Sequence, residues 1–245
     1  MNNKFKFFIF ITLCMGNLLF AKWSFDLETG VVKSGYNNVR IPGKDGTKFS
    51  LKNDIPLDES VFFRLEFVNR YSNNRGLRFL YAPLTLEGDG KLTKDIEFKN
   101  KTFLSGSDVN ALYQFNSYRL TYFRSFCPQK NLNLDFGITG KVRYAKIRIK
   151  DNNQVAEKTD LGFVPLIYLN MKFKMNEKCD ILFGGDMLVA PQGRAEDILT
   201  AITYQVSQKV KLKTGYRFLE GGADNDEVYT FAFVNYFVIG ATIEF

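Results

Sequence analysis

The last eighteen residues of the chain, 228–245, alternate between two kinds of side chain. Nearly every second position is large and apolar, as at Tyr229, Phe237 and Ile243, whereas the positions between them are smaller and partly polar. A repeat of two residues indicates a β-strand whose two faces meet different surroundings. The segment therefore predicts a strand with one broad apolar face, and the chain ends on the aromatic residue Phe245.

The first 21 residues have the features of a secretory signal peptide. Lys4 and Lys6 precede an apolar run, and Leu19-Phe20-Ala21 precedes the expected cleavage site. The segment is too short to span a bilayer, so we expect residues 1–21 to be removed, with an uncleaved anchor as the alternative. We expect residues 22–245 to form one all-β domain, because they contain no apolar run of roughly 20 residues that could form a membrane helix.

Segments with the same alternation recur between these two ends. We predict ten strands, at residues 23–32, 60–70, 76–86, 111–126, 132–150, 160–175, 179–190, 196–206, 210–218 and 228–245. The links after strands one, three, five, seven and nine are long or rich in Gly, Pro and charge, and the others are short. An even number of strands with alternating long and short links is typical of transmembrane β-barrels. Eight or twelve strands remain alternatives, as does a soluble β-sandwich, although a sandwich would place its polar faces outside.

With this terminal strand, leader and strand rhythm, the chain resembles the bacterial outer-membrane β-barrel class of OmpA-, OmpX- and porin-like proteins. The resemblance covers the whole chain and matches no particular member. It implies an antiparallel up-and-down barrel in the outer membrane, with both termini in the periplasm and with Phe245 as a terminal signal for the barrel assembly machinery. It also implies contact with outer-membrane lipids and lipopolysaccharide.

In such a barrel the apolar face of each strand contacts lipid and the other face lines the lumen. The charged positions of the lumen face are Asp26, Glu28, Arg64, Glu66, Arg78, Arg119, Asp135, Lys141, Arg143, Lys172, Lys174, Asp186, Lys211, Lys213 and Arg217. Because eight strands enclose a space just filled by side chains, we expect ten to enclose a narrow, salt-bridged and mostly closed lumen. Four lysines at its periplasmic mouth, Lys172, Lys174, Lys211 and Lys213, would bias any passage toward anions.

Three stretches depart from the regular pattern. After Tyr144 the apolar residues change parity to Ile147 and Ile149, which predicts a β-bulge or the point where the strand leaves the membrane. In the strand at 196–206 the alternation is weak, and we assign Ile198, Ile202, Tyr204 and Val206 to the lipid face. The links at 33–59 and 87–110 are longer than usual, which favours a role in recognition.

The residue types limit the chemistry. The chain contains no histidine, so it lacks the usual base of hydrolytic dyads, and we predict neither catalytic residues nor a cofactor. Cys127 and Cys179 lie beside predicted short turns with two strands between them, a spacing that disfavours a disulfide, although pairing stays the alternative. Two separated cysteines without histidine supply no zinc site. The formal net charge of +7 includes no linear Lys/Arg cluster, which argues against nucleic-acid binding.

The last polar link, 220–227, offers a weak calcium site. The carboxylates of Glu220, Asp224, Asp226 and Glu227 are the hard oxygen donors that calcium prefers, but they lack the order of an EF-hand loop. A solvated loop tip is the alternative.

Two classes of function remain open from the sequence. The first is a minor channel or transport protein, or a structural envelope protein, with a mostly closed lumen. The second is a surface protein that binds a partner, a host surface or lipopolysaccharide through its extracellular loops. A membrane enzyme that works without histidine is a remote third.

Overall fold

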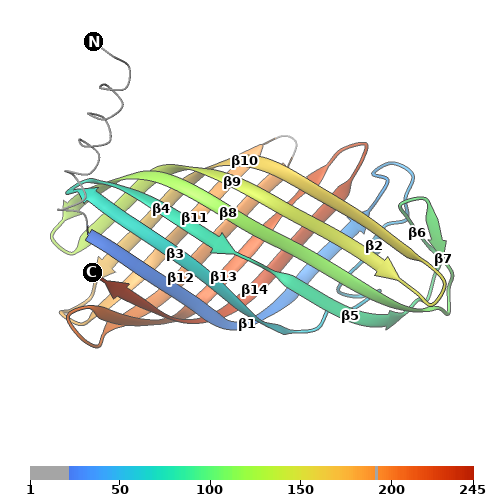
Figure 1. Ribbon diagram of the computed structural model, residues 1–245, viewed down its shortest axis with the longest axis horizontal. Coiled ribbons are helices and arrows are strands. Elements are labelled where there is room, and N and C mark those ends of the chain that lie inside the picture. The colour runs from blue at the N-terminus through green and yellow to red at the C-terminus, as the bar shows by residue number, and fades with distance from the viewer. Residues whose placement is uncertain (1–21, 191–192) are drawn as a thin grey trace, which may run out of the picture.

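The computed structural model describes residues 22–190 and 193–245, and most of them lie in one antiparallel sheet that closes on itself (Figure 1). The predicted signal peptide falls outside the described residues. Among the described residues no helix is long and apolar enough to cross a membrane. The strands are β1 (Lys22–Arg40), β2 (Phe49–Ser50), β3 (Ser60–Ser72), β4 (Arg75–Ala82), β5 (Thr85–Lys91), β6 (Ile96–Phe98), β7 (Lys101–Phe103), β8 (Asp108–Gln129), β9 (Leu132–Lys150), β10 (Val155–Lys174), β11 (Cys179–Ala190), β12 (Gly193–Gln205), β13 (Val210–Asp224) and β14 (Tyr229–Glu244).

The strands follow one another around the barrel in chain order. β1 pairs with β3, β3 with β4, β4 with β8, and each later strand with the next, until β14 pairs with β1 and closes the ring. β5 continues β4 beyond Pro83 along the same neighbour β8, and β2 pairs with the far end of β1. The barrel therefore has ten strand positions, which confirms the predicted number.

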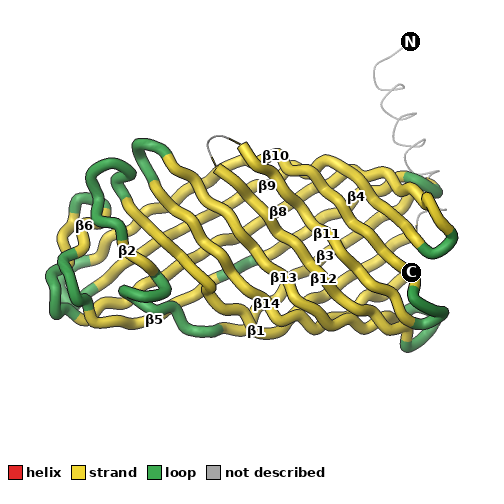
Figure 2. Tube along the Cα trace, turned by 180° about the vertical axis from the view of Figure 1, so that it is seen from behind, coloured by secondary structure: helices red, strands yellow, loops and turns green. Residues whose placement is uncertain are grey.

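The two ends of the barrel differ. The start of β1 and the carboxyl end lie together at one end, where the backbone amide of Phe245 donates a hydrogen bond to Trp23 O (2.8 Å) (Figure 1). The links at this end are short, as at the periplasmic end of barrels of this kind. The β6–β7 hairpin lies at the opposite end, which we call the extracellular end (Figure 2).

The outer surface carries a belt of exposed apolar side chains. Val61, Ile138 and Phe163 are 76%, 69% and 70% exposed, and residues of the same parity on the neighbouring strands are exposed as well. The opposite parity points inward and is mostly buried. The predicted division into a lipid face and a lumen face is therefore confirmed for the middle of the barrel.

The predicted bulge in β9 is wrong. β9 pairs with β10 without a register shift from Leu132 to Lys150, and Ile147 and Ile149 face inward, where they are 6% and 0% exposed. Apolar residues occupy the inward positions after Tyr144 because the extracellular half of the barrel interior is apolar. In β12, Ile202 and Tyr204 are exposed as predicted, whereas Ile198 is buried.

The predicted long loops are also shorter than expected. β1 continues to Arg40, and β5 pairs with β8 as far as Lys91 opposite Asp108, so the links shrink to residues 41–59 and 92–107. The strands extend beyond the apolar belt because pairing with a neighbour satisfies their backbone groups there as well. For the same reason β13 runs on to Asp224, through half of the predicted last loop.

The links at the extracellular end close the barrel there. Residues 49–58 fill the space between β1 and β5, and the amide of Asp58 donates to Glu87 O (2.8 Å). The backbone at Pro56 can come this close to β5 only because residue 88 is glycine, where a Cβ atom would lie 1.9 Å from Pro56 O. We call residues 92–107, which include the β6–β7 hairpin, the cap. Hydrogen bonds join the cap to Thr47 on one side and to Gln154 on the other.

An apolar core lies beneath the cap. It joins side chains of the links to inward-facing side chains of the strands, and all of its members are buried. It includes Val39, Phe49, Leu51, Ile55, Ile96, Phe98, Phe103, Val109, Ala111, Ile147 and Ile149. The interior of the barrel is therefore apolar under the cap and charged nearer the middle.

Candidate functional site

Ion pairs cross the middle of the lumen. Arg119 on β8 places Nη1 2.7 Å from Asp186 Oδ2 on β11 and Nη2 2.6 Å from Asp197 Oδ2 on β12. β8 and β12 are four positions apart around a ring of ten. Arg119 is 2% exposed, so these contacts lie in the centre of the filled barrel.

Asp197 is the centre of this network. Besides Arg119, it accepts hydrogen bonds from Arg64 (2.9 Å) on β3 and from Arg217 (2.7 Å) on β13. Three arginines thus share the single negative charge of Asp197. Glu28 supplies a second negative charge, because its carboxylate lies 2.9 Å from Arg217 Nη2 and 2.7 Å from Lys213 Nζ. A buried charge is tolerated when it is paired and hydrogen-bonded, and these groups satisfy that condition.

A second group of side chains extends the network toward the periplasmic end. Arg78 pairs with Glu66 (2.6 Å) and Asp186 (3.1 Å), and its guanidinium lies 4.7 Å from the centre of the Tyr168 ring. The hydroxyl of Thr139 donates to Asp186 Oδ1 (2.6 Å). The network therefore joins β1, β3, β4, β8, β9, β11, β12 and β13 through their inward side chains.

The structure places the predicted lumen residues as follows. Ten are buried in the interior, namely Asp26, Glu28, Arg64, Arg78, Arg119, Asp135, Lys141, Asp186, Lys213 and Arg217. Four are partly exposed, Glu66, Arg143, Lys172 and Lys211, and Lys174 is exposed. Their function as lumen residues stays a prediction.

Sequence reasoning missed Asp197 and Asp180. Asp197 was not assigned to the lumen because residues 193–197 show no alternation, although Leu199, Ala201 and Thr203 share its parity. Asp180 pairs with Lys172 (3.2 Å), and Arg70 of β3, which shares the parity of Arg64, pairs with Asp135 (2.8 Å).

The lysines at the periplasmic mouth are mostly neutralised. Lys213 belongs to the buried network, Lys211 lies 2.7 Å from Glu244, and Lys172 pairs with Asp180. Lys174 has no ion pair among the described residues. The free positive charge at this mouth is therefore smaller than the sequence indicates.

The carboxylates of the calcium candidate do not gather at one place, and three of them face basic side chains. Glu220 accepts two hydrogen bonds of 2.7 Å from Arg194, Asp226 pairs with Lys44, and Glu227 lies near Lys158. The described residues contain no group of three His, Cys, Asp or Glu side chains that could hold a metal ion. Glu220 and Asp224 are held apart because β13 extends to Asp224, and four residues of a strand span about 13 Å. Cys127 and Cys179 are free thiols.

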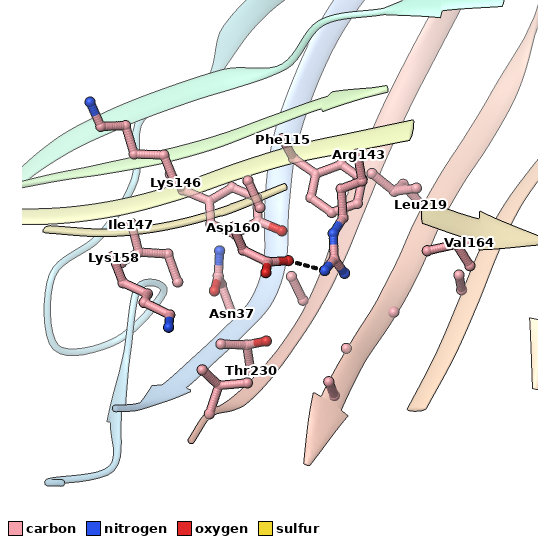
Figure 3. A pocket seen from close by; sticks show the side chains of 18 of the residues that line it. Asn37, Phe115, Arg143, Lys146, Ile147, Lys158, Asp160, Val164, Leu219 and Thr230 are labelled. Atoms are coloured by element: carbon pink, nitrogen blue, oxygen red, sulfur yellow. Dashed lines mark hydrogen bonds and ion pairs between the residues drawn. The ribbon is translucent and has the colours of Figure 1, made fainter. Parts of the chain in front are cut away.

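A cavity of about 230 Å³ lies in the extracellular half of the barrel. Residues of β8, β9 and β10 line it together with residues of β1, β12, β13 and β14 and of the neighbouring links, such as Ile41 and Asn225. Figure 3 shows Arg143 directed toward Asp160, with Asn37 and Thr230 drawn below Asp160. Charged and apolar side chains both line this space, which distinguishes it from the network below.

The chain resembles known proteins in its structure but not in its sequence. Its sequence matches no protein-family model and no curated protein. The outer membrane protease OmpT from Escherichia coli is similar, with a TM-score of 0.55 and 10% identity over 91% of this chain and 97% of that one. Ail of Yersinia pestis, solved with the heparin analogue sucrose octasulfate, aligns over 91% and 99% with 10% identity and a TM-score of 0.41. The COG4313 outer membrane channel from Pseudomonas putida F1 aligns over 91% and 95% with 9% identity and a TM-score of 0.42.

These findings agree on the kind of protein. The exposed apolar belt surrounds a barrel in which every strand position pairs with a neighbour on each side over at least part of its length, which is how strands satisfy their backbone groups within lipid. The likeness to OmpT shows the fold independently of sequence. The chain is thus a membrane-spanning β-barrel with the fold of bacterial outer-membrane proteins.

Proposed function

We propose that the protein is a closed, non-conducting outer-membrane barrel that acts at its extracellular end, as a surface-interaction or structural envelope protein. The observation that supports this most strongly is the ion network across the lumen. Arg119, Arg64 and Arg78 each reach an aspartate four strand positions away, on the far wall of the barrel.

The network opposes the passage of solutes for an energetic reason. A solute that crossed the lumen would have to separate several of these ion pairs, and breaking a buried pair costs about 3 to 5 kcal/mol. The apolar core and the cap form a second barrier above the network. A passage would therefore require rearrangement at two levels of the barrel.

The extracellular end supports a role in interaction. The strands continue past the apolar belt and hold the cap on a rigid scaffold, which is the usual setting of binding segments. Glu97, Lys99 and Lys101 of the hairpin are exposed, and Leu104 beside it is 61% exposed. These residues are where we expect a surface partner to bind.

An enzymatic function receives less support. The chain has no histidine, so a catalytic site would need a lysine, carboxylate, tyrosine or cysteine as its base. The inward carboxylates at the middle of the barrel are already bound to arginines and lysines. We therefore propose that the protein is not an enzyme.

Liposome swelling tests the proposal. Liposomes that contain the folded protein should swell in isotonic sugar or amino-acid solutions no faster than empty liposomes. A porin reconstituted at the same protein-to-lipid ratio serves as the positive control. Swelling that increases with the amount of protein would contradict a closed lumen and would favour the channel interpretation.

A further inference from the structure

We propose that the cavity in the extracellular half of the barrel binds a small carboxylate with an apolar body, of the size of an aromatic or short aliphatic acid. The inference goes beyond the proposed function and does not depend on it. A barrel can hold a ligand in this cavity whether or not its lumen conducts.

Hydrogen-bond donors without partners converge on the cavity. Lys141 is 2% exposed, and among the described residues it has no ion pair and no hydrogen bond. Asn37 is 1% exposed, and its side-chain nitrogen has no acceptor. Arg143 binds Asp160 through one end of its guanidinium, but its Nε atom is buried without an acceptor. All three residues line the cavity.

The chemistry of these groups selects an anion. Lysine and arginine side chains donate hydrogen bonds and accept none, and the free group of Asn37 is also a donor. A buried polar group without a partner is unfavourable, so a ligand that supplies acceptors is stabilised here. A carboxylate offers two oxygens with about four acceptor sites, and its negative charge would give Lys141 the direct ion pair that it does not make with any described residue.

Lys141 is the cation that determines this preference. Arg143 already has the carboxylate of Asp160, and Lys158 lies 3.8 Å from that of Glu227. The ammonium of Lys141 lies instead 4.7 Å from the centre of the Phe115 ring, an interaction that leaves its hydrogen-bond donors free. One negative charge in the cavity would pair with it.

The rest of the cavity suits an apolar body. Tyr113, Ile147 and Leu219 line it and are each at most 8% exposed. The ring of Tyr113 lies parallel to that of Phe115, with an interplanar angle of 4°. The volume of about 230 Å³ is below the roughly 300 to 1,000 Å³ of drug-sized pockets, so the ligand must be small.

A gap in the strand pairing provides an entrance. β10 pairs with β9 from Val155 onward but with β11 only from Ile167, so residues 155–166 form an open edge among the described residues. Pro165, which has no amide hydrogen, suits such an edge. Asp160 and Val164 belong to this stretch and line the cavity. A ligand can therefore enter from the side, between β10 and β11.

Binding of benzoate to the folded full chain in detergent micelles tests the inference, with benzamide as the neutral analogue of the same shape. Titration calorimetry should show saturable binding of benzoate at least about tenfold tighter than that of benzamide, as expected for a charge-assisted hydrogen bond. Lys141→Met should weaken benzoate binding by at least about tenfold. Lys174→Met removes the same charge from the exposed periplasmic mouth and should leave binding unchanged.

A second variant guards against misfolding of the first. Val164→Trp fills the cavity from the β10 edge and leaves Lys141 in place, so it should abolish binding while the barrel keeps its heat-shifted gel mobility. The absence of saturable benzoate binding to the folded wild type at millimolar concentrations would overturn the inference. A cavity that holds only water would give this result. Equal binding by wild type and a folded Lys141→Met or Val164→Trp variant would overturn it as well.

Discussion

Arg119 and Asp197 lie on strands four positions apart around the barrel, yet Arg119 Nη2 is 2.6 Å from Asp197 Oδ2. Side chains from nearly opposite walls therefore meet in the middle of the lumen. A ten-stranded barrel is only slightly wider than the eight-stranded case that side chains fill by themselves. Wall residues therefore fill the lumen at this level, which supports the proposal of a closed barrel.

Asp197→Asn should destabilise the protein by about 3 to 5 kcal/mol, because it removes the charge that three buried arginines share. The free energy of unfolding in urea, measured in the presence of lipid vesicles, checks this. Asp226→Asn is the matched control, since its pair with Lys44 is exposed and should contribute less than about 1 kcal/mol. Equal effects of the two substitutions would show that the network does not stabilise the barrel.

Ile138→Arg should cost about 2 to 4 kcal/mol in the same assay, because Ile138 is 69% exposed in the middle of the apolar belt of β9. Ile138→Leu keeps the side chain apolar and should change the free energy of unfolding by less than about 1.5 kcal/mol. If arginine were tolerated as well as leucine, this face would not contact lipid.

Phe98→Ala should loosen the cap. The Phe98 ring is 0% exposed and packs edge-on against Phe49, with 5.9 Å between ring centres, so its loss leaves a hole in the apolar core. Trypsin should then cleave within residues 92–107 faster than in the wild type, while the barrel keeps its heat-shifted mobility. Leu104→Ala, at an exposed position, should not change the rate. Equal resistance of the two variants would argue against the cap as part of the core.

Hydrogen exchange should reveal the open edge of β10. The amides of residues 155–166 that point away from β9 have no strand partner among the described residues, so they should exchange much faster than those of residues 167–174. β9, which pairs on both sides, is the internal control. Uniform protection along β10 would mean that the gap beside β11 is closed in solution.

The sequence alone predicts the barrel, its number of strands and its two faces, because the pleat of a strand imposes a period of two. It does not predict the extent of the strands. Beyond the lipid the inward face is free to be apolar, as at Ile147 and Ile149, so the rule that polar residues point inward fails there. Residues that pair as strands at the extracellular end are therefore predicted as long loops from the sequence.

The ion pairs inside the barrel cannot be predicted from the sequence for a different reason. Parity shows that Arg119 and Asp186 point inward, but the offset between distant strands decides which charges meet. Asp197 follows a stretch without alternation, so no pattern assigned it to the lumen. Asn37 of β1 and Lys141 of β9 line the same cavity, and no local signal connects these two segments.

Single-channel recording of the wild type in a planar bilayer tests the closed lumen most directly. The buried network should hold the lumen shut, so repeated insertions of folded protein should produce no stable current steps, while a porin under the same conditions conducts. Stable, reproducible steps from the wild type, of either ion selectivity, would show that ions pass the level of Arg119 and Asp197 and would contradict the proposal of a closed barrel.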